Sequence, residues 1–244
     1  MSKNGICLVI GAGDDTGAAI AKAFAREGLT ACLVRRPRHG DALEKLAEAI
    51  REEGGSAEAC PCDARDEDEM VALIDRIEKD IGPIEVAVFN IGANVRFSIT
   101  ETTSRVFRKV WEMACFSGFL MGREAAKHML TRGRGTILFT GATASVRGAS
   151  GFSAFSAAKH GLRALAQSMA RELGPQNIHV AHIVVDGAID SNFIRENVAD
   201  VDEKRADDAI LNPDHIAANY VMLHKQPRTA WTHELDIRPW KEHW

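Results

Sequence analysis

The chain has 244 residues, enough for one domain or at most two small ones. Hydrophobic residues make up 45% of it and charged residues 26%, a balance typical of a globular chain and not of a disordered or fibrous one. Lys and Arg total 30 against 34 for Asp and Glu, and the resulting net charge of −4 argues against a partner that is a nucleic acid or an anionic membrane.

Neither the first apolar run nor the cysteines indicate a secreted or metal-binding protein. The run Ile6–Ile10 is too short for a signal-peptide core or a membrane span. The cysteines form no C-x-x-C pair and lie near no pair of histidines, so we expect no metal site. We interpret them as small buried residues of a cytoplasmic chain: Cys7, Cys32, Cys60, Cys62 and Cys115.

Short apolar runs alternate with helical patterns up to about residue 185. Strands are predicted at Ile6–Ile10, Thr30–Val34, Ala57–Cys60, Ile84–Phe89, Thr136–Thr140 and His179–Val185. Between them, helices are predicted at Thr16–Glu27, Ala42–Glu53, Glu67–Asp80, Ser104–Met129 and Ser153–Leu173. Strands that alternate with helices of this length predict an α/β fold, a doubly wound parallel sheet with helices on both faces.

The pattern loosens after Asp186. Residues 186–209 are polar and irregular, a helix follows from Asn212-Pro213 to His224, and Thr232–Asp236 is a plausible edge strand. Three of the four tryptophans, Trp231, Trp240 and Trp244, lie in the last fourteen residues, and we expect them to pack over the site or at an interface. We predict a single domain over 1–244, with an excursion at 186–225 and an aromatic tail at 237–244.

A glycine-rich loop joins the first strand to the first helix. It reads Gly11-Ala-Gly13-Asp14-Asp15-Thr16-Gly17. Glycine lets the backbone turn tightly and approach a pyrophosphate, and the helix N-terminus offers unpaired N–H groups. In this strand-to-helix context the loop predicts dinucleotide binding.

Three further segments give the chain a family resemblance. Phe89-Asn90-Ile91-Gly92 looks like the Asn-Asn-Ala-Gly motif of the short-chain dehydrogenase/reductase (SDR) family, and Phe155-Ser-Ala-Ala-Lys159 stands where that family has Tyr-x-x-x-Lys. The segment from Asp186-Gly187 through Ile189 to Ser191 resembles its Pro-Gly-x-x-x-Thr. Order and spacing agree from about residue 5 to residue 236.

The resemblance implies a Rossmann-type, mainly parallel seven-stranded sheet, a nicotinamide cofactor and oxidoreductase activity on a small-molecule substrate. It also implies a homodimer or homotetramer and a pocket shaped by residues 186–209. It assigns cofactor contacts to the glycine loop and to Asn90, Ile91, Gly92, Lys159, Gly187, Ile189 and Ser191, and Asp63-Ala64 matches the adenine-contacting Asp-Val pair. The loop departs from Gly-x-x-x-Gly-x-Gly because Asp15 replaces the middle Gly, and an acidic pair beside a phosphate is an electrostatic cost.

The end of the second strand bears on the choice between NADP(H) and NAD(H). NAD-preferring enzymes usually carry an acidic residue there, to hold the ribose 2′-hydroxyl. This chain has Arg35, Arg36 and, two residues on, Arg38. Guanidinium groups bind phosphate, so we favour NADP(H), while Asp14 counts against a 2′-phosphate and keeps NAD(H) possible.

The catalytic set that the resemblance implies is incomplete. The family's Tyr, Ser and Asn positions fall on Phe155, Ala142 and Ala114, and only Lys159 remains. Phenylalanine has no exchangeable proton, so the usual Tyr-dependent acid–base chemistry is not possible. Thr143, next to the Ser position, could hydrogen-bond a substrate oxygen; Ser156 and His160 point elsewhere on the helix, and the only tyrosine, Tyr220, lies in a helix expected to pack on the sheet.

Two functions follow from this pattern. The first is an oxidoreductase that transfers hydride between NADP(H) and a small, apolar carbonyl, alcohol or enone substrate by a weak or non-standard mechanism. The second is a catalytically inactive NADP(H)-binding sensor or partner subunit.

Overall fold

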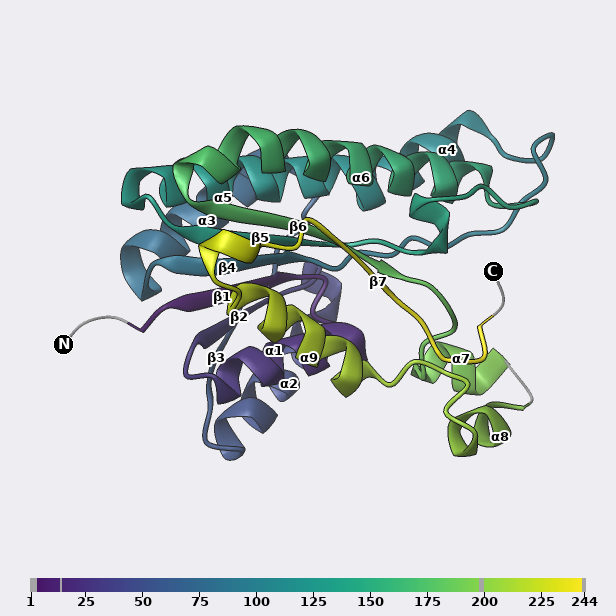
Figure 1. The fold of residues 1–244 in the computed structure, drawn as a ribbon, viewed down its shortest axis with the longest axis horizontal. Coiled ribbons are helices and arrows are strands. Elements are labelled where there is room, and N and C mark those ends of the chain that lie inside the picture. The colour runs from purple at the N-terminus through teal and green to yellow at the C-terminus, as the bar shows by residue number, and fades with distance from the viewer. Residues whose placement is uncertain (1–3, 14, 198–199, 243–244) are drawn as a thin grey trace.

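The protein is built on one seven-stranded parallel sheet with helices on both faces (Figure 1). The computed structural model describes residues 4–13, 15–197 and 200–242. The strands are β1 Ile6–Ile10, β2 Thr30–Val34, β3 Ser56–Ala59, β4 Ile84–Phe89, β5 Gly135–Thr140, β6 Ile178–Val185 and β7 Glu234–Ile237. Their order is β3-β2-β1-β4-β5-β6-β7, and every neighbouring pair is parallel. The predicted doubly wound Rossmann-type fold is therefore confirmed.

The helices form two layers. They are α1 Thr16–Arg26, α2 Gly40–Glu52, α3 Glu67–Arg76, α4 Ser104–Trp111, α5 Ser117–Arg132, α6 Ser153–Leu173, α7 Asn192–Asn197, α8 Val201–Ala206 and α9 Pro213–His224. Buried side chains of α3, α5 and α6 pack on one face of the sheet, and those of α1, α2 and α9 pack on the other (Figure 1). Since both faces are covered, β1 and β6 are buried throughout, which explains the apolar runs Cys7–Ile10 and Ile183–Val185.

The predicted helix Ser104–Met129 forms and continues to Arg132, but it is not α-helical throughout. A π-helical turn at Glu112–Phe116 separates α4 from α5. The Ser117 hydroxyl contacts two backbone carbonyl oxygens of this turn, that of Glu112 at 2.9 Å and that of Met113 at 2.7 Å. This side chain satisfies carbonyls at the point where the α-helical ladder is broken, and apolar periodicity alone does not reveal such a break.

Two predictions about the last sixty residues also need correction. Residues 186–209 are not wholly irregular, because the short helices α7 and α8 form there around a buried carboxylate, Asp190, which binds Arg195 and Arg205. The last strand begins at Glu234 and not at Thr232, since the backbone N–H of Thr232 donates to the side chain of Gln226 and not to β6.

Other findings bear on the chemistry available. All five cysteines are free and buried, as predicted. No cluster of three His, Cys, Asp or Glu side chains suited to a metal ion occurs among the described residues. Within the same residues, no helix has the length and apolar character needed to cross a membrane.

Candidate functional site

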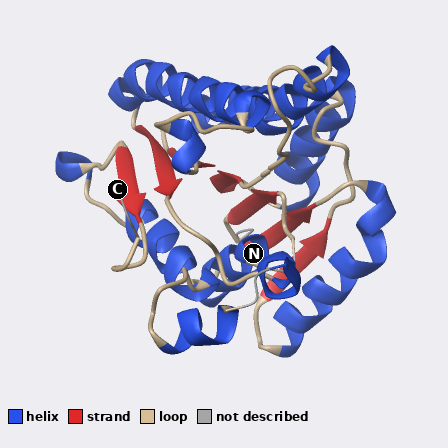
Figure 2. Cartoon of the chain, turned by 90° about the vertical axis from the view of Figure 1, so that its right-hand side faces the viewer, coloured by secondary structure: helices blue, strands red, loops and turns tan. Residues whose placement is uncertain are grey.

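A cavity of about 610 Å³ opens where the carboxyl ends of β1, β4, β5 and β6 meet. Figure 2 views the molecule from the side on which the strands end, and the twisted sheet lies between two layers of helices. Strand order reverses between β1 and β4, which makes this edge the topological switch point where ligands of open α/β sheets bind. The predicted residues on its wall are Gly11, Gly13, Asp15, Thr16, Gly17, Asn90, Ile91, Gly92, Ala142, Thr143, Phe155, Lys159, Gly187, Ile189 and Ser191.

The glycine loop turns as its sequence requires. Gly11 has φ +92°, a conformation that L side chains rarely adopt. A Cβ on Gly17 would lie 2.3 Å from the Gly11 carbonyl oxygen, so only glycine allows this approach of α1 to the loop. Asp15 lies at the N-terminus of α1, and its carboxylate accepts a hydrogen bond of 3.1 Å from the backbone N–H of Asn192. Asp14 lies outside the described residues.

A second cavity of about 250 Å³ adjoins the first beyond β1 and β2. It shares Gly11, Gly13, Asn90, Ile91 and Gly92 with the first and adds four more of the predicted residues, Arg35, Arg36, Asp63 and Ala64. Burial and the neighbouring guanidinium groups of Arg38 and Arg65 lower the pKa of Arg36. The Asp63 carboxylate already binds Arg65, with 2.9 Å between Oδ1 and Nε, and this bond lowers the Asp63 pKa.

Lys159 is buried between the sheet and α6. Only 2% of it is exposed, and Nζ donates to the carbonyl oxygens of Ile91 at 2.9 Å and Thr140 at 2.8 Å. Burial lowers the pKa of Lys159 to about 7, and among the described residues Cys115 alone acts in the other direction. The amine thus titrates near neutrality on the cavity wall.

The three positions that lack a catalytic side chain lie together. Ala114 and Phe155 belong to one buried apolar cluster, and Ala142 packs against it. Ala114 is fully buried in the π-helical turn and lies off the cavity wall, whereas Ala142 and Phe155 line the cavity. At these three positions the site therefore offers hydrocarbon where the resemblance implies hydroxyl and amide groups.

The structure places the possible substitutes at different points. Thr143 lines the cavity, and its hydroxyl donates to the carboxylate of Asp186. Ser156 also lines it, with a buried hydroxyl that finds no hydrogen-bond partner among the described residues, whereas His160 is exposed and lies off the wall. Tyr220 is fully buried in α9 and shares a 2.7 Å hydrogen bond with the Thr140 side chain, so it packs on the sheet as predicted.

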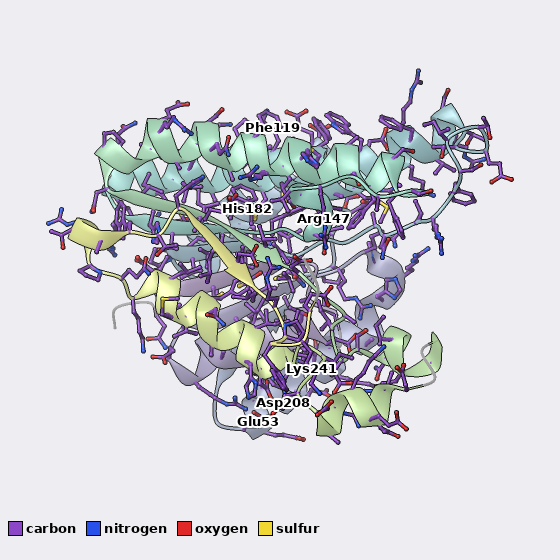
Figure 3. All side chains as sticks on the ribbon, turned by 45° about the vertical axis from the view of Figure 1, so that its right-hand side comes forward. Glu53, Phe119, Arg147, His182, Asp208 and Lys241 are labelled. Carbon is purple, nitrogen blue, oxygen red and sulfur yellow. The ribbon has the colours of Figure 1, made fainter. Side chains whose placement is uncertain are left out.

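Two side chains of the C-terminal tail bind Asp207, which directly follows α8. Trp240 Nε1 donates to the Asp207 carbonyl at 3.0 Å, and Lys241 binds the Asp207 carboxylate, near Asp208 in Figure 3. Trp240 is nevertheless 73% exposed, and Trp231 stacks on His179 at 4.8 Å, at the start of β6 and away from the cavity. Trp231 therefore does not pack over the site, and a role of these tryptophans at an interface stays a prediction; Trp244 lies outside the described residues.

Sequence reasoning missed several residues of this site, of which four carry a polar or aromatic side chain that bears on its chemistry. Asn94, Arg147 and Phe152 line the cavity, and Asp186 lies behind Thr143. Only Asp186 carried a signal, because it stands where the resembled motif has proline. The other three lie on loops whose course no periodicity predicts.

Comparison with known proteins assigns the fold to a family. The family model described as short chain dehydrogenase matches residues 5–202, and the chain belongs to this family of oxidoreductases. A short-chain dehydrogenase from Rhodopseudomonas palustris is 50% identical, with a TM-score of 0.84 over 98% of this chain and 100% of that one.

Two other relatives have a described activity. The 2-dehydro-3-deoxy-D-gluconate 5-dehydrogenase of Formosa agariphila is 30% identical over 178 residues, which are 73% of this chain and 67% of that protein. A 7α-hydroxysteroid dehydrogenase, solved with NADH and 7-oxo glycochenodeoxycholic acid, is 25% identical with a TM-score of 0.87 over 98% of this chain and 94% of that one.

Proposed function

We propose that the protein is an NADP(H)-dependent oxidoreductase acting on a small alcohol, carbonyl or enone whose body is apolar. The observation that carries this proposal is the pair of adjoining cavities that share the glycine loop and Asn90-Ile91-Gly92. Together they offer a phosphate-binding helix N-terminus between a basic chamber and a largely apolar one, the layout that an extended dinucleotide requires. The 7α-hydroxysteroid dehydrogenase with NADH supports a nicotinamide ligand in this fold.

The basic chamber favours the phosphorylated cofactor. Arg35 and Arg36 line it, while Asp63 is turned to Arg65. No carboxylate stands at the end of β2 to hold a ribose 2′-hydroxyl, so a 2′-phosphate between guanidinium groups is the better match. NAD(H) is the alternative that the binding experiment below distinguishes.

Each residue has a limited task in this proposal. The bound nicotinamide supplies the exchange of a hydride with the substrate. Lys159, with two of its hydrogens on backbone carbonyls, presents its remaining one to a ribose hydroxyl. Thr143 holds the substrate oxygen, and Phe155 with Ala142 keeps water from the reacting carbon. A site that lacks the usual acid forgoes roughly 10²–10⁴-fold in rate, while positioning still contributes on the order of 7–11 kcal/mol.

A second candidate is a sensor or partner subunit that binds NADP(H) without turnover. The apolar cluster of Ala114, Ala142 and Phe155 favours it, because three groups of one catalytic set are absent together. We also propose a homodimer or homotetramer in the cytoplasm. The exposed side chains of Phe107 and Trp111 on α4 and of Leu130 on α5 support an interface there, which light scattering after size exclusion tests.

Titration with NADPH and NADH, followed by tryptophan quenching and by cofactor fluorescence, tests the first proposal. It is followed by a screen of alcohols with NADP⁺ and of ketones and enones with NADPH. Tighter binding of NADPH with measurable turnover supports the oxidoreductase. Binding without turnover supports the sensor, and an absence of binding contradicts both.

A further inference from the structure

Thr143 and Asp186 face each other across the ends of β5 and β6. The Thr143 hydroxyl donates to Asp186 Oδ1. Asp186 is only 3% exposed, and its backbone N–H donates to the Ile237 carbonyl at 2.9 Å, which fixes it beside β7. Asp186 stands where the resembled family motif has proline, and Thr143 directly follows Ala142, which stands at the family's serine position. The residue that replaces the proline thus binds the hydroxyl next to the lost serine, at the cavity wall.

Charged groups from two other elements surround this carboxylate. Arg238, after β7, approaches Asp186 Oδ2 to 3.2 Å with Nη1, and Arg147 approaches Oδ1 to 3.9 Å with Nη2. Nη2 of Arg238 donates a hydrogen bond of 2.6 Å to the Asp236 carboxylate, and the negative charge of Glu242 also helps to raise the pKa of this guanidinium. Figure 3 shows Arg147 below the helix α6, where it lines the cavity. The guanidinium groups compensate a buried negative charge that would otherwise be costly.

This arrangement fixes what the Thr143 oxygen can do. A hydroxyl carries one hydrogen and two acceptor lone pairs, and the hydrogen of Thr143 is committed to Asp186. The oxygen is therefore an acceptor toward the cavity. A carbonyl substrate offers no hydrogen to it, whereas an alcohol does. We infer that Thr143 and Asp186 form a proton-accepting pair that makes the substrate an alcohol: Thr143 receives the hydroxyl hydrogen, and Asp186 is the positioning residue that accepts the Thr143 proton.

The inference rests on the proposed function, and the hydride and proton transfers that it requires balance. As the carbon–hydrogen bond of the alcohol breaks, its electron pair leaves with the hydrogen as hydride, for which the acceptor is an oxidised nicotinamide. The hydroxyl proton passes to Thr143 Oγ1, and the Thr143 proton passes to Asp186. Asp186 then returns this proton to water. The products are a carbonyl compound, reduced cofactor and one proton.

Binding of 2,2,2-trifluoroethanol, an alcohol that resists oxidation, tests the pair without turnover. Its dissociation constant is measured by fluorine NMR, with and without saturating NADP⁺. Thr143→Val should weaken binding by about tenfold, the effect of one lost hydrogen bond to a charge-linked group, and Thr143→Ser should restore it. Asp186→Asn, which replaces the carboxylate that accepts the Thr143 hydrogen by a neutral amide, should weaken binding as well.

Ser156→Ala is the matched control, since it removes another hydroxyl of the same wall without touching the pair. It should bind trifluoroethanol as the wild type does. Wild-type binding that is undetectable, or that is unchanged in Thr143→Val or in Asp186→Asn, overturns the inference, and so does an equal loss in Ser156→Ala. Failure of NADP⁺ to bind contradicts the proposed function alone, because the cofactor-free arm still tests the pair. Turnover of carbonyl compounds or enones with none of any alcohol overturns the inference and leaves the proposed function standing.

Discussion

The ammonium group of Lys159 lies 5.9 Å from the centroid of the Phe155 ring, one helical turn away on α6. The two side chains share a helix face, which is the spacing that in the resembled motif joins a lysine to a phenol. In this chain the Lys159 side chain instead lies near the hydrocarbon ring of Phe155. Its ammonium group donates to the Ile91 and Thr140 carbonyls, and no carboxylate of the described residues forms an ion pair with it.

The first prediction restores the missing hydroxyls. The double variant Phe155→Tyr, Ala142→Ser places a phenol beside Lys159 and a hydroxyl on the same wall, so we expect turnover of carbonyl substrates to rise roughly 10²–10⁴-fold. Steady-state consumption of NADPH measures it. Phe152→Tyr, which adds a phenol elsewhere on the cavity wall, should leave the rate near that of the wild type. Equal gains in both variants would contradict the assignment of position 155.

The second prediction concerns Lys159 and stability. Its pKa of about 7 in the folded protein lies below the ordinary 10.5, so between these values the unfolded chain binds the additional proton. Stability should therefore rise with pH, by roughly 2 kcal/mol between pH 7 and 8.5. Above that range cysteines with raised pKa, such as Cys62, oppose the trend.

Urea unfolding at several pH values measures this effect. Lys159→Met should be more stable than the wild type at pH 7 and should lack the rise to pH 8.5. The exposed Lys45→Met should keep the slope of the wild type. An unaltered slope in Lys159→Met would show that the buried amine is not its source.

The fold could be predicted from the sequence because its signals are local. Apolar runs between turn residues marked six strands closely, and a Pro after Asn212 marked the start of α9. The π-helical turn at Glu112–Phe116 was not predictable, since its apolar spacing matches that of an α-helix. The Ser117 hydroxyl hydrogen-bonds to carbonyls of this turn, a contact within the helix that apolar spacing does not reveal.

The residues of the site also fall into two groups: those that local motifs identify and those that only the strand topology brings together. Gly11, Gly17 and Lys159 were identified by motif spacing, and the structure places all three on the cavity. The contact between Thr143 and Asp186 joins residues 43 positions apart, and it depends on β5 and β6 ending side by side. Arg238 reaches the same carboxylate only because β7 pairs with β6. Contacts of this kind follow from topology and not from any local pattern.

The third prediction concerns the different contributions of the three arginines that follow β2 to cofactor binding. Arg35 and Arg36 line the smaller cavity, whereas Arg38 is exposed and lies off its wall. Arg35→Gln and Arg36→Gln should each weaken NADPH binding by about tenfold or more, through loss of a charged hydrogen bond to phosphate, and leave NADH binding nearly unchanged. Arg38→Gln is the matched control. Parallel titrations with both cofactors measure the effect, and equal losses for NADPH and NADH would contradict a 2′-phosphate site.

The fourth prediction concerns His182, a fully buried residue of β6. Its ring packs closely against Gly141, which directly follows the neighbouring strand β5. A Cβ on Gly141 would lie 2.4 Å from Nε2 of His182. Burial lowers the pKa of His182 to about 4, although Nδ1 lies 3.2 Å from the Glu234 carboxylate, because lost hydration outweighs that attraction. The ring is thus neutral in the folded protein across most of the range in which the unfolded chain takes up its proton.

The sign follows from the depressed pKa. Between pH 6.5 and 4 the unfolded state binds the additional proton, so stability is lost as the pH falls, by roughly 3 kcal/mol over the whole interval. His179 and His224 also have lowered pKa values and contribute in the same direction. His182→Gln should therefore reduce the acid-induced loss without abolishing it, as measured by urea unfolding from pH 7 to pH 4. The exposed His215→Gln should retain the full loss, and a His182→Gln curve parallel to that of the wild type would exclude His182 as a source of the acid sensitivity.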